Sequence, residues 1–537
     1  MVGTKQRKEE FVSGLAGTSH VEVFVLSQAL VLLMCHANAA RLHVLGERWA
    51  PARGVVHFLL ETCSVMLPLL GMVTGLVPAE AAVCVLVALY AASVLLPLAR
   101  FSYGATGVVT EAQLSGATNL CARRKVYVSL FRGGLMLYTC LCILAVDFNA
   151  FPRRFAKAET YGAGLMDVGV GGIIVASGLV SVGRRGAGGG GGDTGTIHPA
   201  VAAAAAAAAE PASLRLARGL RAALPCLVLG CVRLVSVKLL GYQEHVGEYG
   251  AHWNFFATIA AVTLLAHAAP VPPRSLAAAA AGVAALHQLA LSAGLGAWAL
   301  SPERGPGLLA ANKEGIVSVP GYWALYLAGG ALAHAMHVTA QPVARTLAHV
   351  ARGERGSRGA LWVWLALWAA VDAALWAVAL ALEALVEARS RRSCNAAFVA
   401  WSAALSLSLL LPLAAAQAAW TLSWRAPHAG SSADGEAGFT GFTRMRLQDP
   451  GDGEAAQQQQ QQQQQVAERC APWLPAAASR SMLAVFLAAN VLTGLVNMSI
   501  DTLAADDWTA RAVVGSYMVA VAGAVAALDA WGVVIRI

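Results

Sequence analysis

The sequence predicts an all-α, polytopic integral membrane protein with about 13 transmembrane helices, folded as a single membrane domain over residues 1–537. The first reason is composition: hydrophobic residues make up 57% of the chain and charged residues only 13%, which is roughly half the charged fraction of a soluble domain. The second reason is that apolar runs recur along the whole chain, each near the roughly 20 residues that a spanning helix needs.

The expected spans follow one another with mostly short connections. The first span follows a polar start that contains Lys5, Arg7 and Glu10, which argues against a cleavable signal peptide. Several later spans are rich in alanine and are expected to pack closely against neighbouring helices. The runs lie at residues 20–40, 55–77, 79–100, 126–148, 164–182, 219–240, 251–270, 275–300, 319–338, 361–386, 394–420, 481–501 and 512–534.

Two low-complexity segments separate groups of spans. Residues 183–213 contain a glycine run and the alanines 202–209, and residues 421–480 contain the glutamines 457–465. Such compositions bury too little apolar surface to become ordered. We therefore expect a flexible Gly/Ala-rich cytosolic linker at 183–213 and a disordered Gln-rich cytosolic loop at 421–480.

The distribution of charge predicts the orientation. An odd number of spans puts the two termini on opposite sides, and about twice as many lysines and arginines fall on the C-terminal side, which predicts a cytosolic C-terminus. The net charge of +8 does not indicate a nucleic-acid partner, because the arginines are dispersed among the loops. Alternation of the spans then puts five loops on the N-terminal side: 148–163, 241–250, 301–318, 387–393 and 502–511.

The densest group of charged residues lies between the fourth and fifth expected spans. Asp147 directly follows an apolar run, and a basic turn marked by proline leads on to Lys157. The chain shows no serine nucleophile elbow, Cys/His pair or Walker loop in a suitable context, so direct transfer with a general base is favoured over covalent catalysis. Asp147 suits the base, and Lys157 suits a cation that stabilises an oxyanion; an interfacial salt bridge is the alternative.

The loop at 241–250 carries a second polar group. Glu244 and Glu248 are spaced to share a helical face, and His252 and Asn254 follow closely. These side chains fit a polar wall that hydrogen-bonds a sugar or inositol ring. A charge network that holds two helices is the alternative, and the spacing matches no metal motif.

The remaining loops leave their alternatives open. Lys313 either meets a phosphate or is a solvated loop lysine. The arginines 389, 391 and 392 either bind a headgroup phosphate or lie at the interface. Asn497 and Asp501 point the same way along one helix, where hydrogen bonds between helices are the commoner explanation.

Five stretches of the chain carry a resemblance, in this order: KEEFVSGLAGTS (Lys8–Ser19), FPRRFAKAETYGAGLMDVGVG (Phe151–Gly171), YQEHVGEYGAHWNFF (Tyr242–Phe256), NKEGIVSVPGY (Asn312–Tyr322) and NVLTGLVNMSIDTL (Asn490–Leu503). Together they resemble the inositol acyltransferase family of GPI-anchor biosynthesis, which comprises the phosphatidylinositol-glycan class W proteins and their fungal GPI-anchored wall transfer counterparts. Five ordered matches across nearly the whole chain are far more specific than any one of them.

The resemblance implies a multi-pass enzyme of the endoplasmic reticulum membrane with a lumenal N-terminus. Its expected reaction is an O-acyltransfer of a fatty acyl group, typically palmitoyl, from acyl-coenzyme A to the inositol 2-hydroxyl of glucosaminyl-phosphatidylinositol. Acyl-coenzyme A as co-substrate, that lipid and membrane lipid are the expected partners, with no further cofactor and no metal ion. The family's catalytic acid and lysine flank the arginine pair after the fourth helix and map onto Asp147 and Lys157.

Further residues of these loops are predicted to bind substrate: Arg154, Glu159, Asp167, Lys238, Glu244, Glu248, His252, Asn254, Lys313, Asn497 and Asp501. The two low-complexity segments depart from the family and lie away from these residues. The alternative function is a polytopic lipid or solute transporter, in which the intramembrane acids Glu61, Asp372 and Glu383 form an ion path.

Overall fold

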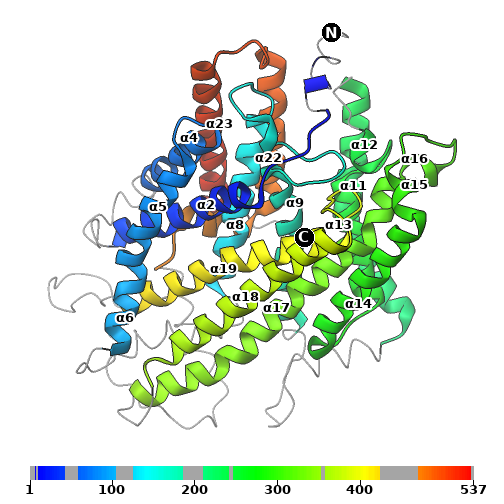
Figure 1. Cartoon of the computed structure of the whole chain (residues 1–537). Helices are drawn as coiled ribbons and strands as arrows, with labels where there is room; N and C mark the ends of the chain where they lie inside the picture. The colour runs from blue at the N-terminus through cyan, green and yellow to red at the C-terminus, as the bar shows by residue number, and fades with distance from the viewer. Residues whose placement is uncertain are drawn as a thin grey trace.

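The computed structural model describes residues 7, 10–11, 13–42, 58–103, 125–185, 210–240, 246–351, 357–423 and 470–533. Within these ranges the regular structure is helical, and the β-type pairing is one isolated bridge between Gly162 and Ser390. The predicted all-α fold is therefore confirmed (Figure 1).

Local sequence sets several of the helix starts. Ser19, Asn254 and Asp506 each accept hydrogen bonds from backbone N–H groups of the first turn that follows them. The principal helices are α2 (His20–Ala40), α4 (Leu67–Val73), α5 (Ala79–Tyr90), α6 (Leu96–Tyr103), α8 (Val126–Ala145), α9 (Leu165–Arg185), α11 (Ala212–Leu240), α12 (Val246–Tyr249), α13 (Phe255–Ala268), α14 (Leu276–Ala290), α15 (Gly296–Leu300), α16 (Leu308–Ala311), α17 (Lys313–Ala351), α18 (Ala360–Leu385), α19 (Ala396–Ser423), α21 (Trp473–Arg480), α22 (Met482–Ser499) and α23 (Asp507–Ala530).

In the described part of the chain ten helices are long and apolar enough to cross a membrane, so the chain is a multi-pass membrane protein. Three further apolar helices, Phe58–Val73, Leu165–Ser181 and Phe255–Ala268, occupy the remaining predicted positions but are shorter. The polytopic architecture is confirmed, whereas the count of about 13 full-length spans is not confirmed within the described ranges.

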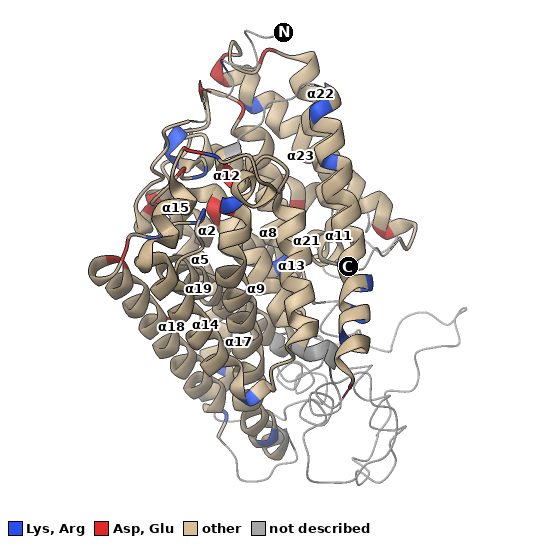
Figure 2. Ribbon diagram, turned by 90° about the vertical axis from the view of Figure 1, so that its right-hand side faces the viewer, with Lys and Arg blue, Asp and Glu red and all other residues tan. Residues whose placement is uncertain are grey.

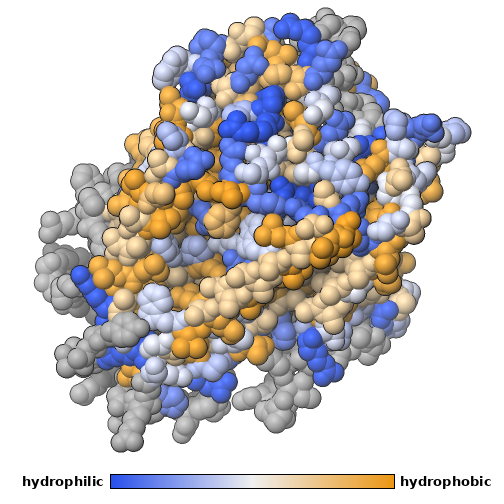
Figure 3. Space-filling model, in the orientation of Figure 1, coloured by the Kyte–Doolittle hydropathy of each residue, from blue (hydrophilic) through white to orange (hydrophobic). Residues whose placement is uncertain are grey.

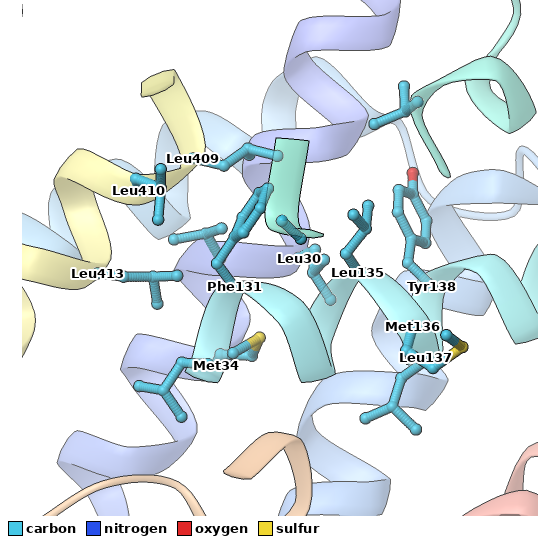
Figure 4. Close-up of a cluster of buried hydrophobic side chains, with 14 of the residues drawn as sticks. Leu30, Met34, Phe131, Leu135, Met136, Leu137, Tyr138, Leu409, Leu410 and Leu413 are labelled. Atoms are coloured by element: carbon cyan, nitrogen blue, oxygen red, sulfur yellow. The ribbon is translucent and has the colours of Figure 1, made fainter. Parts of the chain in front are cut away.

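Helices α2, α8 and α19 form the centre of the bundle. Between 78% and 83% of the apolar stretch of each is buried, against 11% to 17% in α11, α18, α22 and the span that α5 and α6 form. Figure 4 shows the interlocking side chains of this centre, among them Leu30 of α2, Phe131 of α8 and Leu410 of α19. The outer helices instead expose apolar side chains, as expected for surfaces that face lipid.

Helices α9 and α17 pack through glycines. A Cβ atom at Gly178 would lie 2.1 Å from the carbonyl oxygen of Tyr326, and one at Gly329 would lie 2.3 Å from that of Val175. Small residues of this kind allow membrane helices to approach closely. Because α9 and α17 begin at the end of the bundle where the charged loops lie, this packing also fixes the positions of their first turns.

The two low-complexity segments fall largely outside the described residues, which omit 186–209 and 424–469. The predicted C-terminal boundary of the second segment is wrong. Residues Trp473–Arg480 form the helix α21 and are not part of a disordered loop. Leu474 and Ala477 of this helix are buried. Glu61 accepts hydrogen bonds from the first backbone N–H groups of α21, at 2.7 Å and 2.6 Å, which satisfies donors that a helix start leaves unpaired.

Candidate active site

Five connections meet at one end of the bundle in what we call the loop layer, which contains residues 148–164, 246–254, 301–314, 386–395 and 500–506. The alternation of spans predicts that these connections share one side, and their contacts confirm it. Figure 2 shows acidic and basic residues gathered around α12 and α15, whereas the middles of the helices carry little charge. The joining backbone and side-chain hydrogen bonds include Gly162 N to Arg389 O (2.8 Å), Ala251 N to Ala311 O (2.9 Å) and Asn149 Nδ2 to Leu503 O (2.6 Å).

The segment before α2 packs against the loop layer, and residues 13–19 are called the N-terminal strap below. The backbone N–H of Glu159 donates to the carbonyl of Leu15 at 2.8 Å, and that of Thr18 donates to the carbonyl of Ala163 at 3.0 Å. The Glu159 carboxylate in turn accepts from the backbone N–H of Gly14 at 2.6 Å. Glu159 therefore connects the strap to the loop that carries Lys157.

In Figure 3 hydrophilic side chains spread across the upper and middle part of this face and border on hydrophobic surface along α18.

Asp147 directly follows the last turns of α8 and is 7% exposed. Its Oδ2 accepts a hydrogen bond of 2.7 Å from Nδ2 of Asn497, which lies on α22. Of the two polar residues predicted to point the same way along one helix, Asn497 lies on α22 and holds the predicted base, whereas Asp501 lies beyond the end of α22. An amide donor on one oxygen fixes the orientation of the carboxylate.

Arg153 stabilises the turn that follows Asp147. Its guanidinium donates to the carbonyl oxygens of Phe148 at 3.0 Å and Phe151 at 2.8 Å, and it stacks over the ring of Phe11 at 3.9 Å. Burial lowers the pKa of Arg153 to about 10, although the negative charge of Asp147 opposes this shift. No pattern in the sequence singles out Arg153, and only the fold shows a half-buried arginine beside the predicted base.

Lys157 belongs to a different group of charges. Its Nζ donates to Oε1 of Glu248 at 2.8 Å, and the same oxygen accepts from Nη1 of Arg391 at 3.1 Å. Nε of Arg391 lies 2.6 Å from Oδ1 of Asp167. Burial alone raises the pKa of Glu248, but Lys157 and Arg391 lower it to about 2, so this carboxylate is ionised at neutral pH.

The structure therefore places Asp147 and Lys157 at the two ends of one short connection, each within its own polar group. Asp147 lies with Asn497, and Lys157 lies with Glu248, Arg391 and Asp167. Convergence of the two side chains on one lipid-accessible cavity stays a prediction.

Lys313 has neither of the two environments that the sequence left open. It is fully buried at the start of α17, and its Nζ donates to the carbonyls of Trp298, Ser301 and Glu303 and to the Ser301 hydroxyl, at 2.6–2.8 Å. These four acceptors use the three N–H groups of an ammonium. Lys313 is thus not a solvated loop lysine, and it holds the 298–303 segment and has no N–H left for a substrate phosphate.

The three loop arginines are likewise paired inside the protein. Arg389 pairs with Glu383 at 3.0 Å, and Arg392 pairs with Glu314 at 3.0 Å. With Arg391 bound to Asp167, all three guanidinium groups are buried against carboxylates. These ion pairs account for the three arginines without a headgroup phosphate, and phosphate binding by them stays a prediction.

Two further predicted residues lie on the outside of the loop layer. Arg154 is half exposed and pairs with Glu22 of α2 at 2.7 Å, which raises the pKa of the guanidinium. Asp501 is exposed, and its Oδ1 accepts from the backbone N–H of Leu503 at 3.2 Å. Both side chains organise local structure and remain accessible to a ligand.

The polar stretch around α12 is only partly described. His252 is exposed, and its backbone N–H donates to Asn312 Oδ1 at 2.7 Å. Asn254 caps α13 and donates to the carbonyl of Gly230 at 2.9 Å. Lys238 is exposed near the end of α11, and Glu244 lies outside the described residues. Within the ranges that are described, no group of three or more His, Cys, Asp and Glu side chains is arranged to hold a metal ion.

The three intramembrane acids of the transporter alternative lie in separate environments. Glu61 caps α21, Asp372 accepts from the Ser408 hydroxyl at 2.7 Å, and Glu383 pairs with Arg389. Each acid therefore has its own local partner. These contacts explain the presence of the acids without a shared ion path.

The family model described as GWT1 matches residues 4–528. An uncharacterized protein of Arabidopsis thaliana is 32% identical, over 73% of this chain and 70% of its own. The GPI-anchored wall transfer protein 1 of Aspergillus fumigatus is 30% identical, over 98% of this chain and 97% of its own, and the protein of the same name from Gibberella zeae is 31% identical over 99% of both. The chain therefore belongs to the GWT1 family.

Proposed function

We propose that this protein is a membrane-bound O-acyltransferase of GPI-anchor biosynthesis in the endoplasmic reticulum. It transfers a fatty acyl group, such as palmitoyl, from acyl-coenzyme A to the inositol 2-hydroxyl of glucosaminyl-phosphatidylinositol. Membership of the GWT1 family and the names of its fungal relatives support a role connected with GPI anchors. The observation that carries the enzymatic proposal is that a carboxylate and an amine, Asp147 and Lys157, lie on the one connection that leads from α8 through the loop layer at the end of a helical membrane bundle.

The proposed reaction is a single acyl transfer. The inositol oxygen attacks the thioester carbonyl carbon, and its proton passes to Asp147. The tetrahedral oxyanion collapses, the C–S bond breaks, and the proton passes from Asp147 to the leaving coenzyme A thiolate. The products are the acylated lipid and free coenzyme A, so no other reactant is consumed.

Several side chains in the loop layer and on the helices beside it have roles in this proposal. Asn497 orients Asp147 through its amide. Lys157 stabilises the oxyanion or the lipid phosphate, because a fixed cation favours negative charge that develops in a site of low dielectric. Arg154, His252 and Asp501 are accessible to the sugar headgroup. The acyl chain lies between apolar helices, where each buried methylene contributes about 0.8 kcal/mol.

The proposed orientation puts the loop layer and the N-terminus in the lumen and the C-terminus in the cytosol. The excess of lysine and arginine on the opposite side supports it. The sides of the membrane are tested by attaching a glycosylation acceptor to either terminus.

The decisive variant is Asp147→Asn, which preserves the size and the carbonyl acceptor of the side chain but removes the base. Removal of a general base lowers a rate by about 100-fold to 10,000-fold. The assay supplies labelled acyl-coenzyme A and glucosaminyl-phosphatidylinositol to microsomes with matched protein levels. The control is Asp529→Asn, which makes the same chemical change at the ion pair with Arg480 in α21. Acylation at the normal rate in Asp147→Asn would show that the assignment is wrong.

A further inference from the structure

Lys157 takes part in a closed circuit of contacts, which we call the Lys157 ring. The circuit runs from the Lys157 ammonium to Glu248, then to Arg391 and then to Asp167. Asp167 Oδ2 accepts from the backbone N–H of Ala158 at 3.0 Å, and Ala158 is the next residue after Lys157. The ring therefore holds both the tip of the lysine side chain and the backbone at its base.

The ring is closed off from solvent on one side only. Asp167 is fully buried and the Arg391 side chain is 2% exposed, whereas the Lys157 side chain is 36% exposed. Asp167 also accepts from the backbone N–H of Gly164 at 2.7 Å, so its carboxylate spans the loop between residues 158 and 164. In the buried half Asp167 pairs with Arg391 and accepts from the loop backbone, and the lysine forms the open edge of the ring.

The charges of the ring balance, with two cations and two carboxylates. Loss of Arg391 would leave two buried carboxylates to share one ammonium, and an uncompensated buried charge is strongly unfavourable. The ammonium would then be drawn toward Glu248 and Asp167. With Arg391 present, the Lys157 ammonium donates to Glu248, and among the described residues its other two N–H donors make no further hydrogen bond.

We propose that Arg391 is the positioning residue of Lys157. It neutralises Asp167 and shares Glu248, so that the Lys157 ammonium stays at the open edge of the ring and presents its remaining donors to an anionic oxygen of the substrate. This inference rests on the proposed acyl transfer. It also assigns Glu248 and Asp167, predicted from sequence to bind substrate, to the support of Lys157.

The test combines two variants of the ring with a matched control. Arg391→Gln removes the buried cation, and the double variant Asp167→Asn, Arg391→Gln restores the charge balance while an amide oxygen can still accept from Ala158. Arg392→Gln is the control, because Arg392 is the adjacent residue, is similarly buried and pairs with Glu314 outside the ring. All are purified at full length in detergent, and turnover is expressed per folded protein.

The first measurement is chemical labelling of Lys157 by an amine-reactive acetylating reagent, followed by mass spectrometry. At a fixed alkaline pH, Lys157 is expected to label more slowly in Arg391→Gln than in the unmodified protein, because its amine is drawn inward between the carboxylates of Glu248 and Asp167 and away from the reagent. The double variant restores faster labelling, and Arg392→Gln labels at the normal rate. A merely structural role of Arg391 would lower the yield of folded protein without this selective pattern.

The second measurement is acyl transfer. Turnover by Arg391→Gln is expected to fall about 10-fold to 100-fold, as for other partners that orient a reacting group, with partial recovery in the double variant. Normal labelling of Lys157 in Arg391→Gln would overturn the inference even where the enzyme is active. If the labelling pattern holds but the unmodified protein transfers no acyl group, the inference stands and the proposed function fails.

Discussion

Gly162 provides a sharp test of how the N-terminal strap and the loop layer fit together. Its φ of +97° lies where side chains are rarely tolerated, and an added Cβ would lie 2.0 Å from the carbonyl oxygen of Ala16. Its backbone N–H also donates to the carbonyl of Arg389 at 2.8 Å, so the backbone cannot move away freely. Gly162→Ala must therefore displace the strap, strain the backbone, or do both.

The magnitude follows from these contacts. A residue forced into such a backbone conformation costs roughly 1–3 kcal/mol. Displacement of the strap removes up to three hydrogen bonds, two with Glu159 and one with Ala163, each of which contributes about 0.5–1.5 kcal/mol. The expected destabilisation of Gly162→Ala is about 3–7 kcal/mol.

The assay is thermal unfolding of the purified protein in detergent, with limited proteolysis to report release of the strap. Gly523→Ala is the matched control, because Gly523 lies in α23, has no atom within 4 Å of an added Cβ and has no positive φ. Alanine in a helix is favoured over glycine by about 1 kcal/mol, so the control should melt at or slightly above the normal temperature. If Gly162→Ala melts with the control and its strap stays protected, the described packing is refuted.

Two further predictions concern the side chains that support Asp147 and Lys157. Asn497→Ala removes a charge-assisted hydrogen bond worth about 1.5–3 kcal/mol, so acyl transfer per folded protein should fall about 10-fold to 100-fold; an unchanged rate would show that Asp147 is oriented by other groups. Glu248→Gln tests the pH dependence of stability. Although burial opposes it, Lys157 and Arg391 lower the pKa of Glu248 from 4.5 to about 2. The ionised carboxylate therefore contributes stability above pH 4.5 that is lost as the pH falls toward 2. Melting temperatures across this window should fall less steeply in Glu248→Gln, and an identical slope would contradict the pairing.

Composition and apolar runs were sufficient to predict the helical membrane fold, because the length and apolar character of a run of roughly 20 residues decide whether it can span a bilayer. The same rule overestimated the lengths of Phe58–Val73 and Phe255–Ala268. Turns and loops follow Val73 and lie on both sides of Phe255–Ala268, and where a helix ends depends on caps and contacts that hydropathy does not measure.

The sequence by itself also determined which charged loops lie together, since alternation of the spans puts them on one side. The pairing inside that layer required the tertiary structure. Asp167 meets Arg391, and Asp147 meets Asn497, across separations for which local spacing carries no information. Lys313 illustrates the same limit, because a lysine in a loop-like stretch became a fully buried ammonium among carbonyl oxygens. Periodicity decides which segments are helices, whereas only the packing of those helices decides which charges become partners.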